Sequence, residues 1–424
     1  MRRLFRVVRA IVLLTLFSQA HAIEPIGVGV LHSLSGTMAT SEAVLADVAL
    51  MAIEEINAKG GVLGRTLETF VADPASKSEL FAKKARELIS TNKVAVVFGG
   101  FTQQSLVTVL PVFANLNGLL FFPAAYGDVA DSKNAFYTGI SSRQRAAGTV
   151  EYLINLGVKR FVLVSNGSPF ARSNISALRN RLKSNNVGDS EITEKYLPPG
   201  QTDFQEIATA IKEFSHSGAR AAVISTIYGD SNVPFYKELG NHGLKATDVP
   251  VVAFSVGEEE LRGVDTKPLV GHLAAWNYFM SLKNPANAEF TKKWADYAKK
   301  KGIAGHKDKP LTNDPMEATY IGIYMWKQAV EKAKSTDTDK VIAAMAGQTF
   351  KAPSGVSVKM GLKSHRLARN LFIGAVRADG QFDIVWTAPP QITIQTEAAD
   401  CPISGQCQCP TTDGSVVCTN SCCR

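Results

Sequence analysis

Apolar segments that alternate with amphipathic segments along the whole chain constrain its fold more than any other sequence feature. Short apolar runs predict strands at residues 26–31, 67–71, 95–98, 119–122, 160–165, 221–226, 251–254, 273–276, 356–359, 371–376 and 382–386. Amphipathic runs predict helices at residues 78–90, 105–116, 145–156, 174–184, 204–217, 233–244, 288–301, 315–333 and 337–347. Strands separated by helices form right-handed β-α-β units and mostly parallel sheets. The chain is too long for one core, so we expect an α/β fold with two lobes.

The first of these units places polar groups where a small molecule could bind. Its strand leads into a hydroxyl- and glycine-rich loop that contains Ser33 and Ser35, and a helix with an apolar face follows. This helix should end at Lys59-Gly60-Gly61, because glycine suits a left-handed C-cap. A loop at a helix N-terminus presents free N–H groups and hydroxyls. Ser33 and Ser35 are therefore candidate ligand contacts, and capping of the helix is the alternative.

Residues 1–22 have the pattern of a cleavable export signal. Four arginines precede the apolar run 10–17, and Ala20-His21-Ala22 is a small-x-small cleavage site. The run is too short for a permanent membrane span. We therefore expect a mature chain that begins near Ile23 and resides in the periplasm. Removing the leader halves the formal net charge of +8, and no basic–aromatic cluster favours nucleic-acid binding.

The cysteines predict a separate tail. All six lie in the last 24 residues, at Cys401, Cys407, Cys409, Cys418, Cys422 and Cys423. No cysteine follows the leader directly, so we expect no lipid anchor. In an oxidising compartment six cysteines favour three disulfides, for which 15 pairings are possible, and a metal–thiolate cluster is the alternative.

Patterns typical of catalysis, nucleotide binding or metal binding are missing from the sequence. It contains no GxSxG, GxGxxG, GxxxxGK[ST] or HExxH motif, and its lobes hold no cysteine that could act as a nucleophile. Three consecutive acids, Glu258 to Glu260, are typical of a helix start, with a cation site as the alternative. We therefore expect no enzyme activity, no cofactor and no metal in the lobes.

Several sequence blocks resemble a known family of receptors. They include LHSLSGTMA (31–39), MAIEEINAKGGVLG (51–64), KVAVVFG (93–99), STIYGDSNVPFYKELGN (225–241), VVAFSVGEEEL (251–261) and TNDPMEATYIG (312–322). Over residues 26–386 the chain resembles the extracytoplasmic solute-binding proteins of ABC transporters, and within them the urea and short-chain amide branch. The resemblance implies a type I periplasmic-binding fold that closes on a small organic solute and then meets permease subunits in the inner membrane. A periplasmic sensor that passes closure to a signalling partner is the alternative.

The resemblance also implies domain boundaries. Three crossings of the chain, near 137–142, 276–284 and 351, would join the lobes. Lobe one would comprise residues 23–138 and 277–350, lobe two residues 139–276 and 351–390, and the cysteine-rich tail residues 391–424.

The pocket positions implied by the resemblance differ from the family pattern. The family's Gly-Cys-aromatic-x-Ser is Gly99-Gly100-Phe101-Thr102-Gln103 here, and its Tyr-Pro is Phe122-Pro123. Each lost hydrogen-bond partner of a buried polar group costs about 1–3 kcal/mol, so we expect a ligand larger or less polar than urea. The candidate contacts are Ser33, Ser35, Phe101, Thr102, Gln103, Phe122 and Tyr126 in lobe one, and Ser168, Phe170, Thr226, Tyr228 and Ser255 in lobe two. For Phe101 and Phe122, packing in the core is the alternative.

Overall fold

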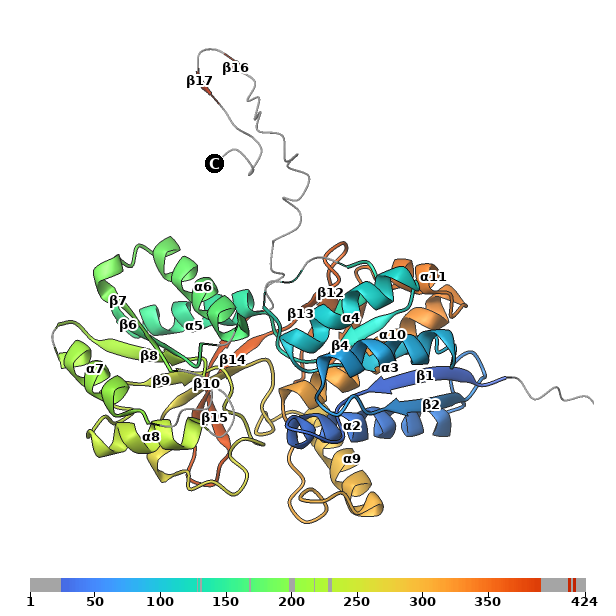
Figure 1. Cartoon of the computed structure of the whole chain (residues 1–424), viewed down its shortest axis with the longest axis horizontal. Helices are drawn as coiled ribbons and strands as arrows, with labels where there is room; N and C mark the ends of the chain where they lie inside the picture. The colour runs from blue at the N-terminus through green and yellow to red at the C-terminus, as the bar shows by residue number, and fades with distance from the viewer. Residues whose placement is uncertain are drawn as a thin grey trace, which may run out of the picture.

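The computed structural model describes residues 24–389, except 128, 130–131, 168, 198–202, 217 and 228–230, and it also describes residues 411–412 and 415–416. Figure 1 shows two lobes that lie side by side, each with a central sheet between helices. The two-lobe α/β fold expected from the sequence is confirmed.

Lobe one contains a five-stranded sheet in the order β2-β1-β3-β4-β5, in which every neighbouring pair is parallel. Its strands are β1 (Ile26–Leu31), β2 (Leu67–Ala72), β3 (Val96–Gly99), β4 (Leu120–Phe122) and β5 (Ala135–Tyr137). Its helices are α2 (Ala39–Ala58), α3 (Ser78–Ser90), α4 (Gln103–Asn115), α9 (Pro285–Lys301), α10 (Asp314–Ala333) and α11 (Thr338–Met345). Lobe one thus combines two parts of the chain that are far apart in sequence.

The two faces of this sheet are covered by different helices. Buried side chains of α2, α9 and α10 pack on one face, where the Trp326 ring meets the Phe98 ring edge-on at a centroid distance of 5.9 Å. Helices α3 and α4 cover the other face, through residues such as Phe81 and Phe113. A sheet that is buried on both faces needs apolar residues on both sides of its strands, which explains the continuous apolar runs in the sequence.

Lobe two contains a seven-stranded sheet in the order β15-β14-β10-β9-β8-β6-β7. The strands are β6 (Arg160–Ser165), β7 (Ile192–Tyr196), β8 (Ala221–Ser225), β9 (Val251–Ala253), β10 (Leu273–Trp276), β14 (Leu371–Val376) and β15 (Phe382–Ala388). Strands β10 to β7 pair in parallel, whereas β14 is antiparallel to both of its neighbours. The helices are α5 (Ser142–Asn155), α6 (Pro169–Ser184), α7 (Gln205–His216) and α8 (Asn232–Asn241), with short 3-10 helices η2 (Asp189–Glu191) and η4 (Lys267–Leu269).

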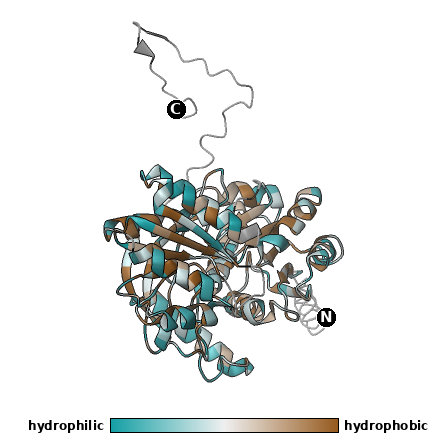
Figure 2. Cartoon of the chain, turned by 60° about the vertical axis from the view of Figure 1, so that its left-hand side comes forward, coloured by the Kyte–Doolittle hydropathy of each residue, from teal (hydrophilic) through white to brown (hydrophobic). Residues whose placement is uncertain are grey.

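The helices of lobe two also divide between the faces of its sheet. Helices α5 and α6 pack on one face and α7 and α8 on the other. Figure 2 shows hydrophobic strands at the centre of the molecule, with hydrophilic residues on the surrounding helices. The apolar side of each amphipathic helix therefore faces a sheet, as its sequence period requires.

Three crossovers connect the lobes, at residues 138–141, 277–284 and 369–370. The third lies later in the chain than the boundary expected at residue 351. A small antiparallel sheet of β11 (Thr349–Lys351), β12 (Ser357–Met360) and β13 (Leu367–Ala368) precedes it, and its buried residues Val358, Met360 and Leu367 join the core of lobe one. The strands are too short for their sequence to indicate which lobe they contact.

Some sequence-based predictions concern the ends of the chain. The leader and all six cysteines lie outside the described residues, which include a two-stranded ladder of β16 (Thr411–Thr412) and β17 (Ser415–Val416). Among the described helices, none combines the length and the apolar character that crossing a membrane requires.

The glycines that follow α2 allow a matched test of the predicted helix end. Both Gly60 and Gly61 have positive φ, at 96° and 76°. A Cβ on Gly61 would lie 1.9 Å from the Arg65 carbonyl oxygen, whereas a Cβ on Gly60 would meet nothing within 4 Å. Gly60→Ala should cost about 1–2 kcal/mol of unfolding free energy, the usual penalty for a left-handed alanine. Gly61→Ala should cost clearly more in urea denaturation, and equal losses would contradict this account.

Candidate ligand-binding site and hinge

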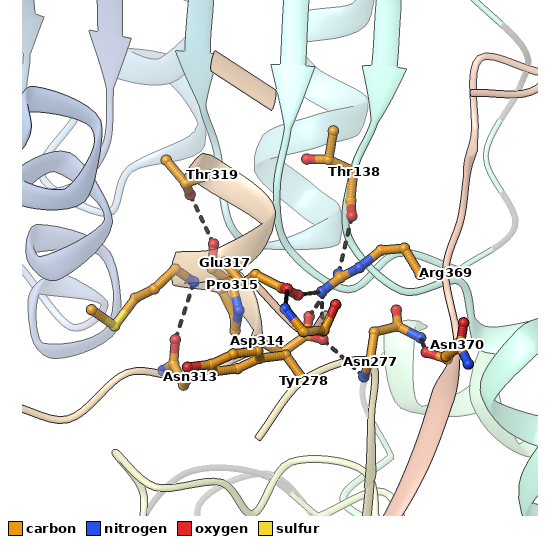
Figure 3. A network of polar contacts seen from close by, with 12 residues as sticks. Thr138, Asn277, Tyr278, Asn313, Asp314, Pro315, Glu317, Thr319, Arg369 and Asn370 are labelled. Atoms are coloured by element: carbon orange, nitrogen blue, oxygen red, sulfur yellow. Dashed lines mark hydrogen bonds and ion pairs between the residues drawn. The ribbon is translucent and has the colours of Figure 1, made fainter. Parts of the chain in front are cut away.

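The three crossovers meet at the amino-terminal end of α10, as Figure 3 shows. Arg369, on the third crossover, donates hydrogen bonds to the carbonyl of Thr138 on the first at 3.2 Å, to Asp314 at 3.2 Å, and to Glu317. Asp314 also accepts the backbone N–H of Asn277, on the second crossover, at 2.8 Å. One guanidinium and one helix end thereby hold all three connections, and we call Arg369, Asp314 and Glu317 the hinge cluster.

The start of α10 is encoded locally. The Asn313 side chain accepts the N–H of Met316 at 3.1 Å, and Pro315 occupies the first turn, where its missing N–H has no cost. Carboxylates are favoured in a first turn because they face the positive end of the helix dipole. The block 312–322, which carries part of the family resemblance, thus builds the hinge.

The hinge cluster keeps its charges away from water. Burial opposes the charge of Arg369, which is 1% exposed, but Asp314 and Glu317 hold the pKa of its guanidinium above the usual value. Burial raises the pKa of Glu317, and the attraction of Arg369 offsets this only in part. The cluster is therefore stable only while the arginine and both carboxyl groups stay together.

A second junction between the lobes involves the turn 257–262, after β9. Buried Glu258 accepts the backbone N–H of Met280, on the second crossover, at 2.6 Å. Burial raises the pKa of Glu258 to about 8. The sequence predicted a helix start at the acids Glu258 to Glu260, but the structure forms a turn there.

Arg262 extends this junction into lobe one. Its guanidinium donates to the carbonyls of Gly305 and Lys309, at 2.7 and 3.0 Å, in the segment between α9 and α10. Glu259 pairs with Arg262 at 2.9 Å and lies 3.5 Å from His306. Charged contacts therefore join the lobes at this junction as well as at the hinge cluster.

The hydroxyls predicted as ligand contacts in the loop after β1 are held by a neighbouring turn. Ser33 Oγ accepts the N–H of Ser76 at 3.0 Å, and Ser35 Oγ donates to Asp73 at 2.7 Å. The N-cap of α2 is Met38, so neither serine caps the helix. These bonds fix the shape of the loop and set the direction of its free groups.

The predicted residues after β3 also make local bonds. Thr102 caps α4 by accepting the N–H of Ser105 at 3.0 Å. Gln103 accepts the N–H of Gly127 at 3.0 Å, which joins the loops that follow β3 and β4. Phe101 is half-buried against the core of lobe one. The structure therefore brings together, through Gln103, two segments of lobe one that carry predicted ligand contacts.

Phe122 and Tyr126 are buried within lobe one. The Phe122 ring packs against Gly100, where an added Cβ would lie 3.0 Å away. The Tyr126 ring lies 4.9 Å from the Tyr137 ring, and burial raises the pKa of its phenol. The Tyr126 carbonyl accepts the N–H of Ser142 at 2.9 Å. Tyr126 thus lies where the chain enters lobe two.

The predicted residues of lobe two connect the ends of its central strands. Thr226 donates through its hydroxyl to the carbonyl of Val164 at 3.2 Å. Ser255 donates to the carbonyl of Ile227 and accepts a bond from Asn232 at 3.5 Å. Two predicted contacts, Ser168 and Tyr228, lie outside the described residues, as does the side chain of Phe170.

A buried arginine that the sequence analysis missed lies beside these strand ends. Arg145, in the first turn of α5, is 2% exposed, and its guanidinium lies 4.4 Å from the Trp276 ring centre and 5.1 Å from that of Phe254. Burial lowers the pKa of Arg145 to about 10, against the attraction of Asp314, so the side chain is charged at neutral pH. Its position in the helix period, four residues before buried Thr149, is a signal that it faces inward.

The comparisons with known proteins identify the family. A family model described as a periplasmic binding protein domain matches residues 26–397. The chain belongs to this family. This periplasmic binding protein is 22% identical over 345 residues to the Leu/Ile/Val-binding protein BraC3 of Rhizobium johnstonii. The matched region covers 80% of this chain and 87% of BraC3. A solute-binding protein of an ABC transporter from R. palustris, in complex with 4-hydroxybenzoate, is similar in fold, with a TM-score of 0.72, 22% identity, and coverage of 87% of this chain and 98% of that chain.

A shorter match covers a small part of a longer protein. It is 33% identical over 132 residues, and it spans 30% of this chain and 22% of a Geobacillus stearothermophilus protein named limonene hydroxylase. Such a short match does not transfer an activity. As a member of its family, this periplasmic binding protein is a binding protein and not an enzyme. Within the described part of the chain, no three His, Cys, Asp or Glu side chains form a group that could hold a metal ion.

The hinge cluster predicts a large effect of Arg369→Met. The substitution leaves two buried carboxyl groups without a counter-charge and should cost the periplasmic binding protein about 3–5 kcal/mol in chemical denaturation. Adding Glu317→Gln to Arg369→Met should restore part of the loss. The control is Arg377→Met, which removes an exposed pair with Asp379 at 2.7 Å and should cost less than about 1 kcal/mol. Similar losses for Arg369→Met and Arg377→Met would contradict the role of the cluster.

Glu258 predicts a specific dependence of stability on pH. Its folded-state pKa of about 8 lies above the ordinary 4.5, so the folded protein binds more protons than the unfolded chain between these values. The stability that this extra proton binding contributes is complete below about pH 4.5 and is lost as the pH rises through 8. Glu258→Gln keeps an oxygen for Met280, and at pH 8 it should stabilise the protein by more than about 1 kcal/mol, since one pKa unit corresponds to about 1.4 kcal/mol.

The advantage of Glu258→Gln should shrink toward pH 5. Thermal unfolding across this range measures it, with Glu213→Gln on the exposed side of α7 as the control. An advantage that does not change with pH would show that Glu258 is not the group that titrates.

Proposed function

We propose that this protein is the periplasmic receptor of an ABC importer. Its lobes close on a small organic solute, and the closed form binds permease subunits in the inner membrane. The convergence of three crossovers on one buried hinge cluster carries the proposal, because such a hinge restricts motion to opening and closing of two rigid lobes. The ligand biases this equilibrium by contacting both lobes at once.

The strand ends of both lobes support this role. In open α/β sheets, ligands bind beyond the carboxyl ends of the strands. Here Ser35 lies in the loop after β1, Gln103 opens the helix that follows β3, and Thr226 and Ser255 lie in the loops after β8 and β9. Their bonds to neighbouring turns and strands position them before a ligand arrives, which lowers the entropy cost of binding.

The solute is larger or less polar than urea. Urea is recognised through hydrogen bonds alone, and this chain has Phe122 and Gly100 where the resemblance implies polar residues. Phe122 is fully buried and fills the space over Gly100. A phenyl ring in this position offers no hydrogen bond to a ligand that consists only of polar groups. Of the amides suggested by the resemblance, only the bulkier ones are therefore candidate solutes.

Thermal unfolding of the purified mature protein tests the proposal. The panel contains urea, acetamide, isovaleramide, benzamide, benzoate, 4-hydroxybenzoate and leucine. A solute present at 100 times its Kd should add about 2.7 kcal/mol to the unfolding free energy and raise Tm by several degrees. We expect a shift with one of the bulkier solutes and no shift with urea at micromolar concentration.

Two outcomes would change the proposal. A micromolar Kd for urea would contradict the altered pocket and restore the ligand that the sequence resemblance suggests. Stabilisation by none of the panel would count against a receptor for small organic solutes. Copurification of the liganded protein with its permease would separate import from a role as a periplasmic sensor.

A further inference from the structure

Arg145 carries a buried charge whose hydrogen-bonding capacity is only partly used. Its Nη1 donates to the carbonyl of Phe254. Its Nε and Nη2 are also buried, and among the described residues they have no hydrogen-bond partner. A buried guanidinium with unpaired donors is costly unless a further group completes its bonds. The protein thus contains a cationic group prepared for a partner that its own described residues do not supply.

The unused edge of Arg145 has the geometry of a carboxylate site. The Nε–H and Nη2–H bonds point in one direction and match the two oxygens of a carboxylate in a bidentate pair. The rings of Trp276 and Phe254 lie close to the guanidinium and favour a cation there. With Nη1 bound to Phe254, a new partner must approach in the plane of the group, along that edge.

The acids of the hinge cluster do not occupy this edge. Asp314 is the acid that influences the charge of Arg145, but one of its oxygens accepts from Arg369 and the other from Asn277. Glu317 is bound by Arg369 and by the N–H of Ser354. Among the described residues, no ion pair joins an acid to Arg145.

The position of Arg145 connects it to the predicted ligand loops. Phe254, whose carbonyl it binds, directly precedes Ser255, and Trp276 donates from its indole to the carbonyl of Val256 at 2.8 Å. Ser142, one helical turn before Arg145, binds the Tyr126 carbonyl of lobe one. The guanidinium therefore lies where residues of both lobes meet.

We propose that Arg145 binds the carboxylate of the solute, which makes the ligand a small organic acid with an apolar body. This rests on the proposed receptor function and, among its small organic solutes, favours acids over the amides that the sequence resemblance suggests. A neutral amide can bond to the same edge, but it supplies no charge to balance the guanidinium. The aromatic rings beside the site suit the apolar body of such an acid.

Matched pairs of acid and amide test the charge requirement without any substitution. The probes are benzoate and benzamide, 4-hydroxybenzoate and 4-hydroxybenzamide, isovalerate and isovaleramide, and leucine and leucinamide. Thermal shifts followed by calorimetric titration should find at least one acid that binds, with its amide at least about tenfold weaker. Amides that bind as tightly as their acids would overturn the inference and leave the receptor function standing. If no probe binds, both proposals fail.

Substitutions then test the residue. Arg145→Gln should lower the affinity for the acid that binds best at least about tenfold. Arg145→Lys should lower this affinity by less, because lysine keeps the charge but lacks the planar fork. Arg143→Gln removes a charge from the exposed side of the same helical turn and should leave binding unchanged. The Tm of each unliganded variant checks that it folds. If Arg145→Gln does not fold, Arg145→Lys provides the test of binding. Unchanged affinity of a folded Arg145 variant would overturn the inference.

Discussion

The burial of Arg369 between Asp314 and Glu317 is the interaction on which the two-lobe arrangement depends. The residues that this cluster joins are distant in sequence and belong to all three crossovers and to α10. Apolar contacts at this place would tolerate sliding of the lobes. Buried charges do not, because each partner that moves away leaves a charge without compensation. In the receptor that we propose, the cluster would fix the axis about which the lobes move, and the ligand would set the angle between them.

Much of the fold follows from the sequence, because it depends on local periodicity. The strands near 26–31 and 160–165 and the helix at 78–90 appear as predicted, since each segment has one apolar face or a continuous apolar run. The position of the third crossover does not follow in this way. Strands β11 to β13 could pack on either lobe, and only the distant core of α10 determines that they join lobe one.

The site was less predictable than the fold, for a related reason. The sequence indicates which residues follow strands but not which bonds their side chains make. Ser33 and Thr102 are committed to Ser76 and to the start of α4, so their hydroxyls stiffen the loops. Arg145 has the opposite character, since it resembles an ordinary polar residue in the sequence and its burial depends on two distant segments, those of Phe254 and Trp276. Long-range burial of a charge leaves only a weak trace in a single sequence.

The interrupted path of the chain through lobe one has a consequence for the order in which the protein folds. Strands β1 to β5 are synthesised first, but α10, which helps to cover one face of their sheet with Trp326, follows only after the inserted segment of lobe two. The sheet of lobe one must therefore wait, with the part of that face that α2 does not cover still exposed, while the continuous segment of lobe two from α5 to β10 can form its parallel strands. New chains are then most vulnerable to aggregation before α10 can pack on the sheet. Early formation of the inserted segment of lobe two would shorten the loop that lobe one has to close.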